Sequence, residues 1–424
     1  MVVDNNNYHF SVYKHSYVIN DEKLLTRNFI VLKDGDLIER FTNFHLYIGH
    51  LGRSIKRLES NDGTRFFYIC KFLNYVFFQQ YHVSKLTDVT SEMVIRFCKE
   101  YGSCTLPDDT PSTHRSKSTI NACLKDVLGF VCVLSKSFPT MKFKENDFYT
   151  EKLHLNMRTK RMEKIKDLSF EIRYNSKEKP IFRDITDEAF TILMNVIIDQ
   201  HTNILMLAAL GAFAGLRPSE ACNVRRKEYG GLSFQLIGDE VTNISIDLNE
   251  EKNMRSDFVP VGGIKKERTQ NVYPAFIKVF CELYKIYMDY IEGRPYETKF
   301  GALTTNRDGL AITYPSYVYE FHKAVNDSIP IMLKSINPQT QLYGQLLQSR
   351  SVSPHIFRHW FSLKLVLYGE DLPALMKYRG DKSPESSLTY LANKSELVKQ
   401  LDHVQNRIFD FELWRASKEY GRSE

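Results

Sequence analysis

Apolar side chains recur at helical spacing over residues 64–137, which is the clearest pattern in the first half of the chain. Phe66, Ile69 and Leu73 fall on one face, because residues three and four apart share a helix face. Two further helices are expected in the same stretch, and Thr90 is placed to cap the first of them. Three or four helices of this length predict a small helical domain.

The segments that flank these helices are less regular. Residues 1–62 alternate apolar and polar positions well enough to predict short strands, with a turn at residues 33–36. Residues 151–184 carry ten Lys or Arg against six Asp or Glu, and their apolar periodicity is weak. That composition favours a charged linker between two domains.

Helical spacing returns after Thr186 and dominates the rest of the chain. Two apolar helices come first, and the second is expected to end at Gly215. Alternating segments at 243–251 and 258–274 favour short strands. Further helices are expected at 275–293 and 314–329.

Three short helices are expected near the C-terminus. Ser353 and Pro354 open the first, because serine caps well and proline suits the first helical position. Gly380 stops the second, and Ser383 with Pro384 opens the third.

The predicted fold class is mainly α with a small β-sheet, and 424 residues exceed what one core usually holds, so two or three domains are expected. In chain order the expected parts are a mixed module at 1–62, a helical domain at 63–150, a charged linker at 151–184, a second domain at 185–405 and a tail at 406–424.

The composition is that of an ordinary folded protein, with 43% hydrophobic and 25% charged residues. A net charge of +6 permits a polyanionic partner without requiring one. The N-terminus does not resemble a signal peptide, and no run of about 18 uncharged apolar residues is present, so no membrane span is expected. We expect a cytoplasmic, nucleoid-associated protein.

The cysteines are odd in number and form no C-x-x-C pair, so disulfides and zinc are disfavoured. Most lie in apolar runs and are interpreted as buried free thiols of a reducing compartment. The seven are Cys70, Cys98, Cys104, Cys123, Cys132, Cys222 and Cys281. The sequence also lacks the glycine-rich phosphate loops, the H-E-x-x-H metal motif and the G-x-S-x-G elbow. Neither a cofactor nor a catalytic metal is therefore expected.

Candidate chemistry lies in a set of basic residues. His355, Arg358 and His359 are spaced to lie on one helix face, whereas a chance cluster on a surface helix is the alternative. Arg217 follows the helix break at Gly215 and is therefore expected at the end of an element. Three residues after this arginine, Glu220 is placed to hold the guanidinium, and a structural salt bridge is the alternative.

Three cations, Lys265, Lys266 and Arg268, occupy a predicted hairpin, which alone is a weak signal because exposed hairpin lysines are common. Tyr390 lies 32 residues after Arg358, on the last of the short helices. Arg217 in the run GLRPSE, a hairpin lysine, the His-x-x-Arg-His run and this tyrosine together resemble the tyrosine recombinase (phage integrase) family. The resemblance covers residues 185–395, about half of the chain, and the helical segment 64–137 is similar to the family's core-binding domain.

The resemblance implies DNA strand transfer through a 3′-phosphotyrosine intermediate, without metal or ATP. Arg217 and Arg358 would hold the scissile phosphate, since arginine donates two parallel hydrogen bonds and keeps its charge. Tyr390 would attack, and His355 would take its proton. Lys265 would protonate the leaving 5′-oxygen, with Lys266 as the alternative. Glu220 and His359 would have supporting roles.

Asp381 departs from the family's pattern, because the family usually has His or Trp at this position. A carboxylate facing a phosphate would be repelled. Asp381 therefore either orients His355 or an arginine, or turns away and leaves Lys382 nearby, or marks an impaired site. We favour the orienting role.

The resemblance further implies double-stranded DNA recombination sites as the partner and assembly of four protomers on DNA. Residues 1–62 are either an accessory DNA-binding module or a stabilising extension, and the amphipathic tail either docks on a neighbouring protomer or folds back. An accessory DNA-bending or directionality factor is left open.

Three functions compete on these features. The first is integration and excision of a mobile element, and the second is a resolving or inverting recombinase with the same chemistry. The third is a DNA-binding protein that has lost catalysis, which Asp381 alone favours.

Overall fold

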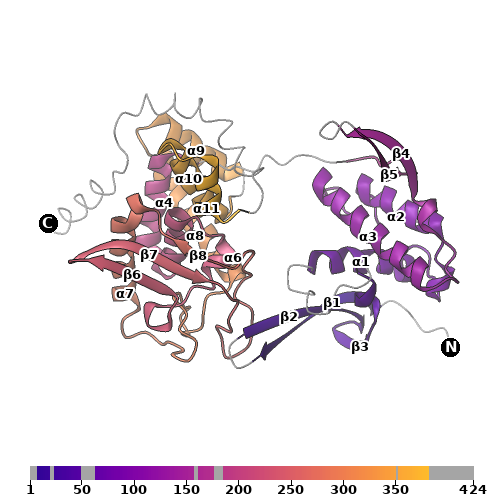
Figure 1. Ribbon diagram of the computed structural model, residues 1–424, viewed down its shortest axis with the longest axis horizontal. Coiled ribbons are helices and arrows are strands. Elements are labelled where there is room, and N and C mark those ends of the chain that lie inside the picture. The colour runs from indigo at the N-terminus through magenta and orange to yellow at the C-terminus, as the bar shows by residue number, and fades with distance from the viewer. Residues whose placement is uncertain are drawn as a thin grey trace. The chain divides into compact units, whose positions relative to one another are not determined.

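The computed structural model describes residues 7–19, 23–48, 63–156, 161–175, 185–349 and 352–381. The chain divides into two compact units, of which the first contains residues 1–17 and 25–180 and the second contains residues 18–24 and 181–424 (Figure 1). Each unit has its own hydrophobic core. The two units are described separately below.

Three helices form the centre of the first unit, as the apolar spacing predicts. Thr90 accepts a hydrogen bond from the Met93 backbone N–H at 3.4 Å and caps the second helix, and Ser116 caps the third through the Thr119 N–H at 3.1 Å. The helices are α1 (Gly63–Asn74), which continues into the π-helical turn η5 (Tyr75–Gln79), α2 (Ser91–Ser103) and α3 (Lys117–Ser137).

The N-terminal strands share the core of these helices. Strands β1 (Tyr8–Ile19), β2 (Lys23–Asp34) and β3 (Leu37–Phe41) form one sheet in that order, followed by η2 (Phe44–Tyr47). Buried Phe10 and Ile30 pack in the same cluster as Phe66, and Asn74 hydrogen-bonds to both backbone groups of Phe10. The predicted strands are therefore present among the described residues of 1–62, and their apolar side chains help to close the helical core.

Residues 151–184, which were interpreted as a charged linker, include most of a β-hairpin that was not predicted. Strands β4 (Tyr149–Asn156) and β5 (Arg161–Leu168) form a two-stranded antiparallel hairpin in which Tyr149 pairs with Leu168. Exposed ion pairs cross this hairpin, such as Lys152 to Asp167 at 2.7 Å. Apolar periodicity is weak because side chains such as Leu153 remain exposed.

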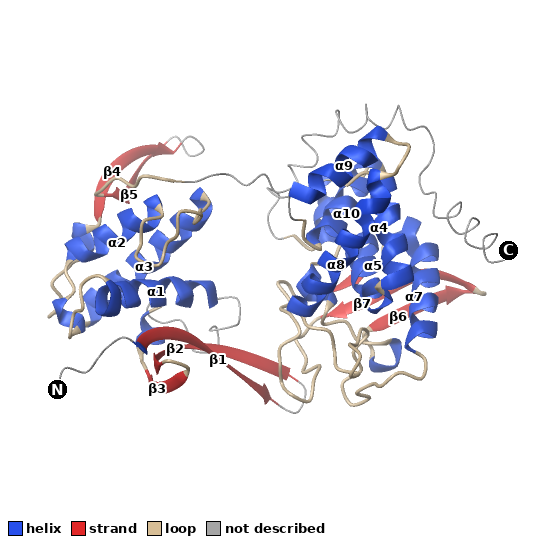
Figure 2. Ribbon diagram, turned by 180° about the vertical axis from the view of Figure 1, so that it is seen from behind, coloured by secondary structure: helices blue, strands red, loops and turns tan. Residues whose placement is uncertain are grey.

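The second unit packs helices around α5 (Leu205–Ala214), whose ten residues are all buried (Figure 2). One face is completed by an antiparallel sheet of β6 (Leu232–Ile237), β7 (Glu240–Leu248) and β8 (Arg268–Asn271) in that order. The other helices are α4 (Asp187–Gln200), α6 (Pro218–Ala221), α7 (Ile277–Ile291), α8 (Tyr314–Leu333), α9 (Pro338–Ser349), α10 (His355–Leu367) and α11 (Leu372–Arg379). Short 3-10 turns are η6 (Leu86–Asp88) and η7 (Glu145–Asp147) in the first unit, and η8 (Thr202–Ile204), η9 (Lys227–Tyr229) and η10 (Pro274–Phe276) in the second.

The mainly α fold with small sheets is therefore confirmed, and three local predictions need correction. The strand expected over residues 258–274 is reduced to β8, because residues 249–267 form a long loop between β7 and β8. Helix α10 begins with Pro354 in its N-cap position, one residue later than the Ser353 cap that was predicted. Helix α9 was not predicted, because few of its residues are buried.

Helix α3 has the length and hydropathy of a membrane span, as does the bent pair of α4 with η8 and α5. Core helices of folded domains meet the same criteria, and half of the apolar window of α3 is buried. Its buried side chains, among them Val127 and Phe130, pack in the core of the first unit.

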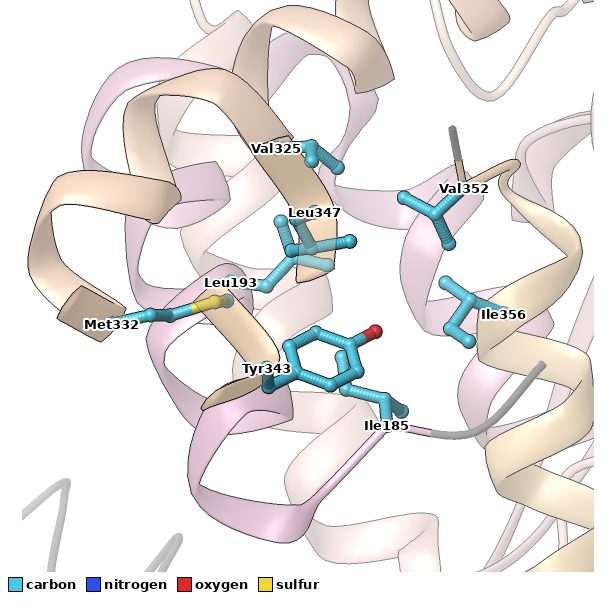
Figure 3. A pocket seen from close by; sticks show the side chains of 8 residues that line it. All are labelled: Ile185, Leu193, Val325, Met332, Tyr343, Leu347, Val352 and Ile356. Carbon is cyan, nitrogen blue, oxygen red and sulfur yellow. The ribbon is translucent and has the colours of Figure 1, made fainter. Parts of the chain in front are cut away.

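An apolar gap in the second unit lies where α4, α8, α9 and α10 meet (Figure 3). It leaves no space that a water molecule could enter, so it is a packing seam of the core and not a ligand site. The seam is lined by Ile185, Leu193, Val325, Met332, Tyr343, Leu347, Val352 and Ile356.

Gly215 provides a test of the turn that ends α5. Its φ is +64°, and a Cβ there would meet the Phe361 ring at 2.5 Å. Gly238 has a similar φ of +62° in the β6–β7 turn but open space around it. Left-handed backbone costs a non-glycine residue about 1 kcal/mol, and overpacking adds about 1–3 kcal/mol. In urea unfolding, Gly215→Ala should lose at least twice the free energy that Gly238→Ala loses, and equal losses would contradict this account of the turn.

Candidate functional site

Arg217 lies at the junction between two helices. Gly215 ends α5 in the left-handed conformation, and Arg217 then takes the extended N-cap position of α6, where Pro218 is the first residue. The Glu220 carboxylate returns to this cap and accepts the Arg217 backbone N–H at 3.1 Å. The guanidinium is thereby held at the edge of the core, with 16% of the side chain exposed.

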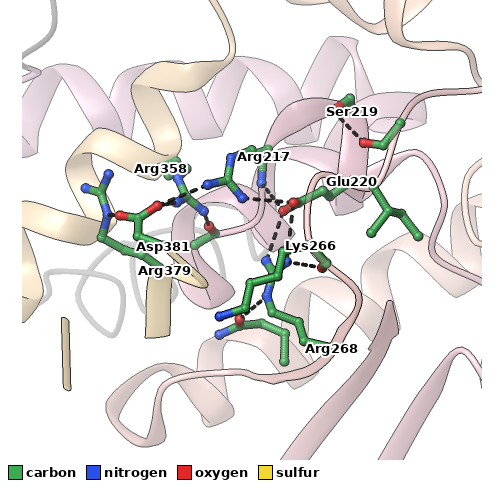
Figure 4. Close-up of polar contacts among 12 residues, drawn as sticks. Arg217, Ser219, Glu220, Lys266, Arg268, Arg358, Arg379 and Asp381 are labelled. Atoms are coloured by element: carbon green, nitrogen blue, oxygen red, sulfur yellow. Dashed lines mark hydrogen bonds and ion pairs between the residues drawn. The ribbon is translucent and has the colours of Figure 1, made fainter. Parts of the chain in front are cut away.

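Glu220 joins two arginines from different elements (Figure 4). Its side chain is fully buried, and it accepts hydrogen bonds from Arg217 Nη1 at 2.9 Å and from Arg268 Nη2 at 2.9 Å. Burial raises the pKa of the Glu220 carboxyl, but the hydrogen bond and charge of Arg268 and the charge of Arg217 outweigh it and keep that pKa below its ordinary value. The carboxylate is therefore charged at neutral pH.

Arg358 comes to the same place from helix α10. It donates to the carbonyl oxygen of Gly215 through Nη1 and to Asp381 Oδ1 through Nη2 at 2.8 Å. Burial, with the charges of Arg217 and Arg379, lowers the pKa of Arg358 to about 9. The guanidinium still carries its charge at neutral pH.

Asp381 lies between three arginines. Its Oδ1 accepts from both Arg217 Nη2 at 3.0 Å and Arg358 Nη2 at 2.8 Å, and its Oδ2 accepts from Arg379 Nε at 2.7 Å. Gly380 ends α11 with a φ of +62° and turns the chain so that Asp381 follows directly. These contacts with arginines are what the proposed orienting role of Asp381 requires.

His355 and His359 lie on α10 with Arg358, as expected, and both are half-buried. Burial lowers the pKa of His355, and the positive charges of Arg358 and Arg217 lower it further. The imidazole is therefore neutral at neutral pH and able to accept a proton.

The two candidate lysines lie in the loop between β7 and β8, immediately before β8. Lys265 is exposed and Lys266 is half-buried. A hairpin was predicted at these lysines, and the strands that they connect are antiparallel, but the connection is a long loop of 19 residues, 249–267. Tyr390 and Lys382, with the expected third helix and the tail, lie outside the described residues.

Two members of this cluster were not assigned from the sequence. Arg268 was noted only as a hairpin cation, and Arg379 was not noted at all, although it donates to Asp381 and to the Ser362 hydroxyl. The signal for Arg379 was its place in the last turn of α11, two residues before Asp381.

Four arginines and two carboxylates leave this cluster with two surplus positive charges. Such a site suits an anionic ligand with oxygen acceptors. Within the ranges that the structure describes, no group of three or more His, Cys, Asp or Glu residues is placed to hold a metal ion.

The stability of this cluster should depend on pH through Glu220. Because its pKa in the folded protein lies below the ordinary 4.5, its contribution is complete above about pH 4.5 and is lost as the pH falls through the folded value. Glu220→Gln should lose about 3 kcal/mol at pH 7, since it removes the carboxylate that pairs with Arg268 and one of the two carboxylates that pair with Arg217. Urea unfolding should show this difference shrinking below about pH 4.5, and Glu267→Gln, an exposed neighbour of Arg268, should show little loss. A difference that stays constant with pH would contradict the role of this carboxylate.

Comparison with known proteins gives matches among solved structures. No protein-family model and no curated protein matches the sequence. The Tn1549 transposon integrase, solved with circular intermediate DNA, is 14% identical and aligns with 79% of this chain and 90% of its own at a TM-score of 0.50. The XerH site-specific recombinase, bound to its difH substrate, is 17% identical, and the match covers 79% of this chain and 77% of the XerH chain at a TM-score of 0.45. A lambda integrase dimer bound to a core site is 11% identical, and the match covers 76% of this chain and 86% of the lambda integrase chain at a TM-score of 0.40.

The Tn1549 match covers more of this chain than either unit contains, so it includes residues of both units. A helical unit closed by small strands comes first, and a second unit built around α5 carries the arginine cluster. This chain therefore has the fold of the tyrosine recombinases, in which a helical core-binding domain precedes a catalytic domain.

Proposed function

We propose that this protein is a site-specific DNA recombinase that cuts and rejoins DNA through a phosphotyrosine at Tyr390. The observation that carries the proposal is that Arg217 and Arg358, from different helices, donate to one and the same oxygen of Asp381. Two guanidinium groups that converge on one carboxylate oxygen are arranged to converge equally on a phosphate oxygen. The surplus positive charge of the cluster favours such a ligand.

The converging arginines keep donors for DNA. Each guanidinium has five N–H groups, of which Arg217 and Arg358 each use two side-chain donors on described residues. The remaining groups are available to the non-bridging oxygens of a phosphodiester, whose negative charge grows in the transition state. Asp381 then orients the two arginines and does not itself contact DNA.

The other residues supply the proton transfers. Tyr390 attacks the phosphorus, and neutral His355 takes the phenolic proton. Lys265 protonates the departing 5′-oxygen, which leaves a 3′-phosphotyrosine and a free 5′-hydroxyl. The new ester retains the bond energy, so a second DNA end can reseal the break without ATP.

The substrate in this proposal is double-stranded DNA that carries a recombination site, and four protomers assemble on two such sites. The Tn1549 transposon integrase, whose fold this chain resembles, was solved in complex with circular intermediate DNA. Integration and excision of a mobile element is therefore the favoured role. Resolution or inversion by the same chemistry is the alternative.

A second candidate function is DNA binding without catalysis, because Asp381 occupies donors that a phosphate would use. A recombinase cleaves its DNA site, whereas a DNA-binding protein without catalysis does not, so an assay for DNA cleavage distinguishes the two functions.

The test of the nucleophile uses a duplex built from DNA adjacent to the gene, with a nick that lets the cleaved end escape. The wild-type protein should form a covalent protein–DNA adduct, and Tyr390→Phe should form none, because phenylalanine has no oxygen to attack phosphorus. Adducts are measured by denaturing gel electrophoresis. Tyr319→Phe, an exposed tyrosine on α8, is the matched control and should keep the wild-type yield. An adduct that survives Tyr390→Phe would refute the assignment.

The role of Asp381 is tested by two substitutions in the same assay. Asp381→Ala should lower the cleavage rate by about 10²-fold or more, because the two arginines lose their common anchor. Asp381→His should not restore it. A many-fold increase with histidine would show instead that the aspartate impairs the site.

A further inference from the structure

The loop that carries Lys265 is attached to helix α6 before the lysine. Ser219 Oγ donates to the Gly263 carbonyl oxygen at 3.0 Å, and Asn223 Nδ2 donates to the Gly262 carbonyl oxygen at 3.0 Å. A Cβ on Gly262 would overlap the backbone of Ser219, so this close approach requires a glycine. The backbone is thus fixed two residues before the lysine.

Arg268 makes the attachment on the other side of the lysine. Its Nη1 donates to the Lys266 carbonyl oxygen at 2.8 Å, while Nη2 and Nη1 form a fork on the Glu220 carboxylate at 2.9 and 3.3 Å (Figure 4). Glu220 belongs to α6, the same helix that holds the loop before the lysine. One four-residue helix therefore fixes the backbone on both sides of Lys265.

Arg268 is not placed to serve as a ligand of DNA. Four of its five N–H groups are used, on Glu220, Lys266 and Gln270. Its side chain is 10% exposed, and a Cβ on Gly380 would overlap its guanidinium. Arg268 donates to the backbone carbonyl of Lys266 and to the buried carboxylate of Glu220, as expected for a residue that positions the loop.

Lys265 has the opposite character. It is exposed, and its ammonium group has no hydrogen bond or ion pair to any other residue in the described part of the chain. Its charge is nevertheless among those that lower the pKa of His355, so it lies within electrostatic reach of the proposed proton acceptor. The backbone beneath the side chain is fixed while the ammonium remains available.

We propose that Arg268, together with Ser219, is a positioning residue that holds Lys265 in a constant relation to Arg217. The fork on Glu220 connects the lysine loop to the arginine that binds the phosphate, because Glu220 also accepts from Arg217. This proposal rests on the recombinase function above. It adds that the proton donor and the phosphate clamp are parts of one rigid unit built on α6.

The step affected is the departure of the 5′-oxygen. As the bond from Tyr390 to phosphorus forms, the bond from phosphorus to the 5′-oxygen breaks, and that oxygen takes a proton from the Lys265 ammonium. The tyrosine proton passes to His355. Loss of Arg268 should misplace the ammonium and slow this protonation, while the phosphate remains held by Arg217 and Arg358.

The experiment compares two DNA substrates that differ in one atom, the bridging 5′-oxygen, which is replaced by sulfur in one of them. A thiolate is a much weaker base than an alkoxide and leaves without a proton. Lys265→Ala should slow cleavage of the oxygen substrate by about 10²–10³-fold, as expected for loss of a general acid, and cleave the sulfur substrate at nearly the wild-type rate. Arg268→Gln should show the same pattern, in which cleavage of the oxygen substrate slows by about 30-fold and cleavage of the sulfur substrate stays near the wild-type rate.

The measured quantity is the ratio of the sulfur rate to the oxygen rate, from adduct formation by the full-length protein. Arg268→Gln and Ser219→Ala should both raise this ratio, and Ser219→Ala should raise it by less. Arg268→Lys should raise the ratio by less than Arg268→Gln. Arg217→Gln should slow both substrates and keep the wild-type ratio. Arg226→Gln, a half-buried arginine that stacks on Tyr296 away from the cluster, is the matched control and should also keep it.

Two results would overturn the proposal. One is an Arg268→Gln protein that loses rate equally on both substrates, which would place the arginine in folding or phosphate binding. The other is a raised ratio in Lys266→Ala but not in Lys265→Ala, which would make Lys266 the donor. Failure of the recombinase function is distinct, because the wild-type protein would then form no adduct at Tyr390 with either substrate.

Discussion

The cluster in the second unit depends on the pairing of four arginines with two buried carboxylates. Guanidinium groups this close repel one another, and burial alone disfavours their charge. Glu220 and Asp381 offset that repulsion by accepting from two and from three arginines. The remaining structure of this unit serves to bring these six side chains to one place without exposing them fully to water.

Two glycines make that convergence geometrically possible. Gly215 ends α5 beneath the Phe361 ring, so the next residues can turn outward at the edge of the core. Gly380 ends α11 against the guanidinium of Arg268, so Asp381 enters the cluster directly after the helix. A side chain at Gly215 would displace the Phe361 ring of the core, and a side chain at Gly380 would displace the Arg268 guanidinium. The apolar helix α5 provides the rigid support from which the first turn departs.

Local patterns allowed much of this to be predicted. The cap at Thr90, the break at Gly215 and the spacing of His355 and Arg358 are properties of a few neighbouring residues. What escaped prediction depends on contacts between distant segments. The role of Arg268 depends on its contact with Glu220, which lies 48 residues earlier in the chain. The packing of the N-terminal strands likewise depends on the helices that complete their core. The hairpin at 149–168 escaped for another reason, since a ribbon with exposed apolar side chains gives little alternation.

Arg379 has a consequence for how this site changes through evolution. The buried guanidinium of Arg379 is paired with Asp381 Oδ2, and it also donates to the Ser362 hydroxyl. If position 381 returned to the histidine or tryptophan common in the family, Arg379 would lose the carboxylate to which it donates and remain next to two other arginines. The aspartate and the arginine two residues before it are therefore expected to change together, so that related sequences carry both or neither.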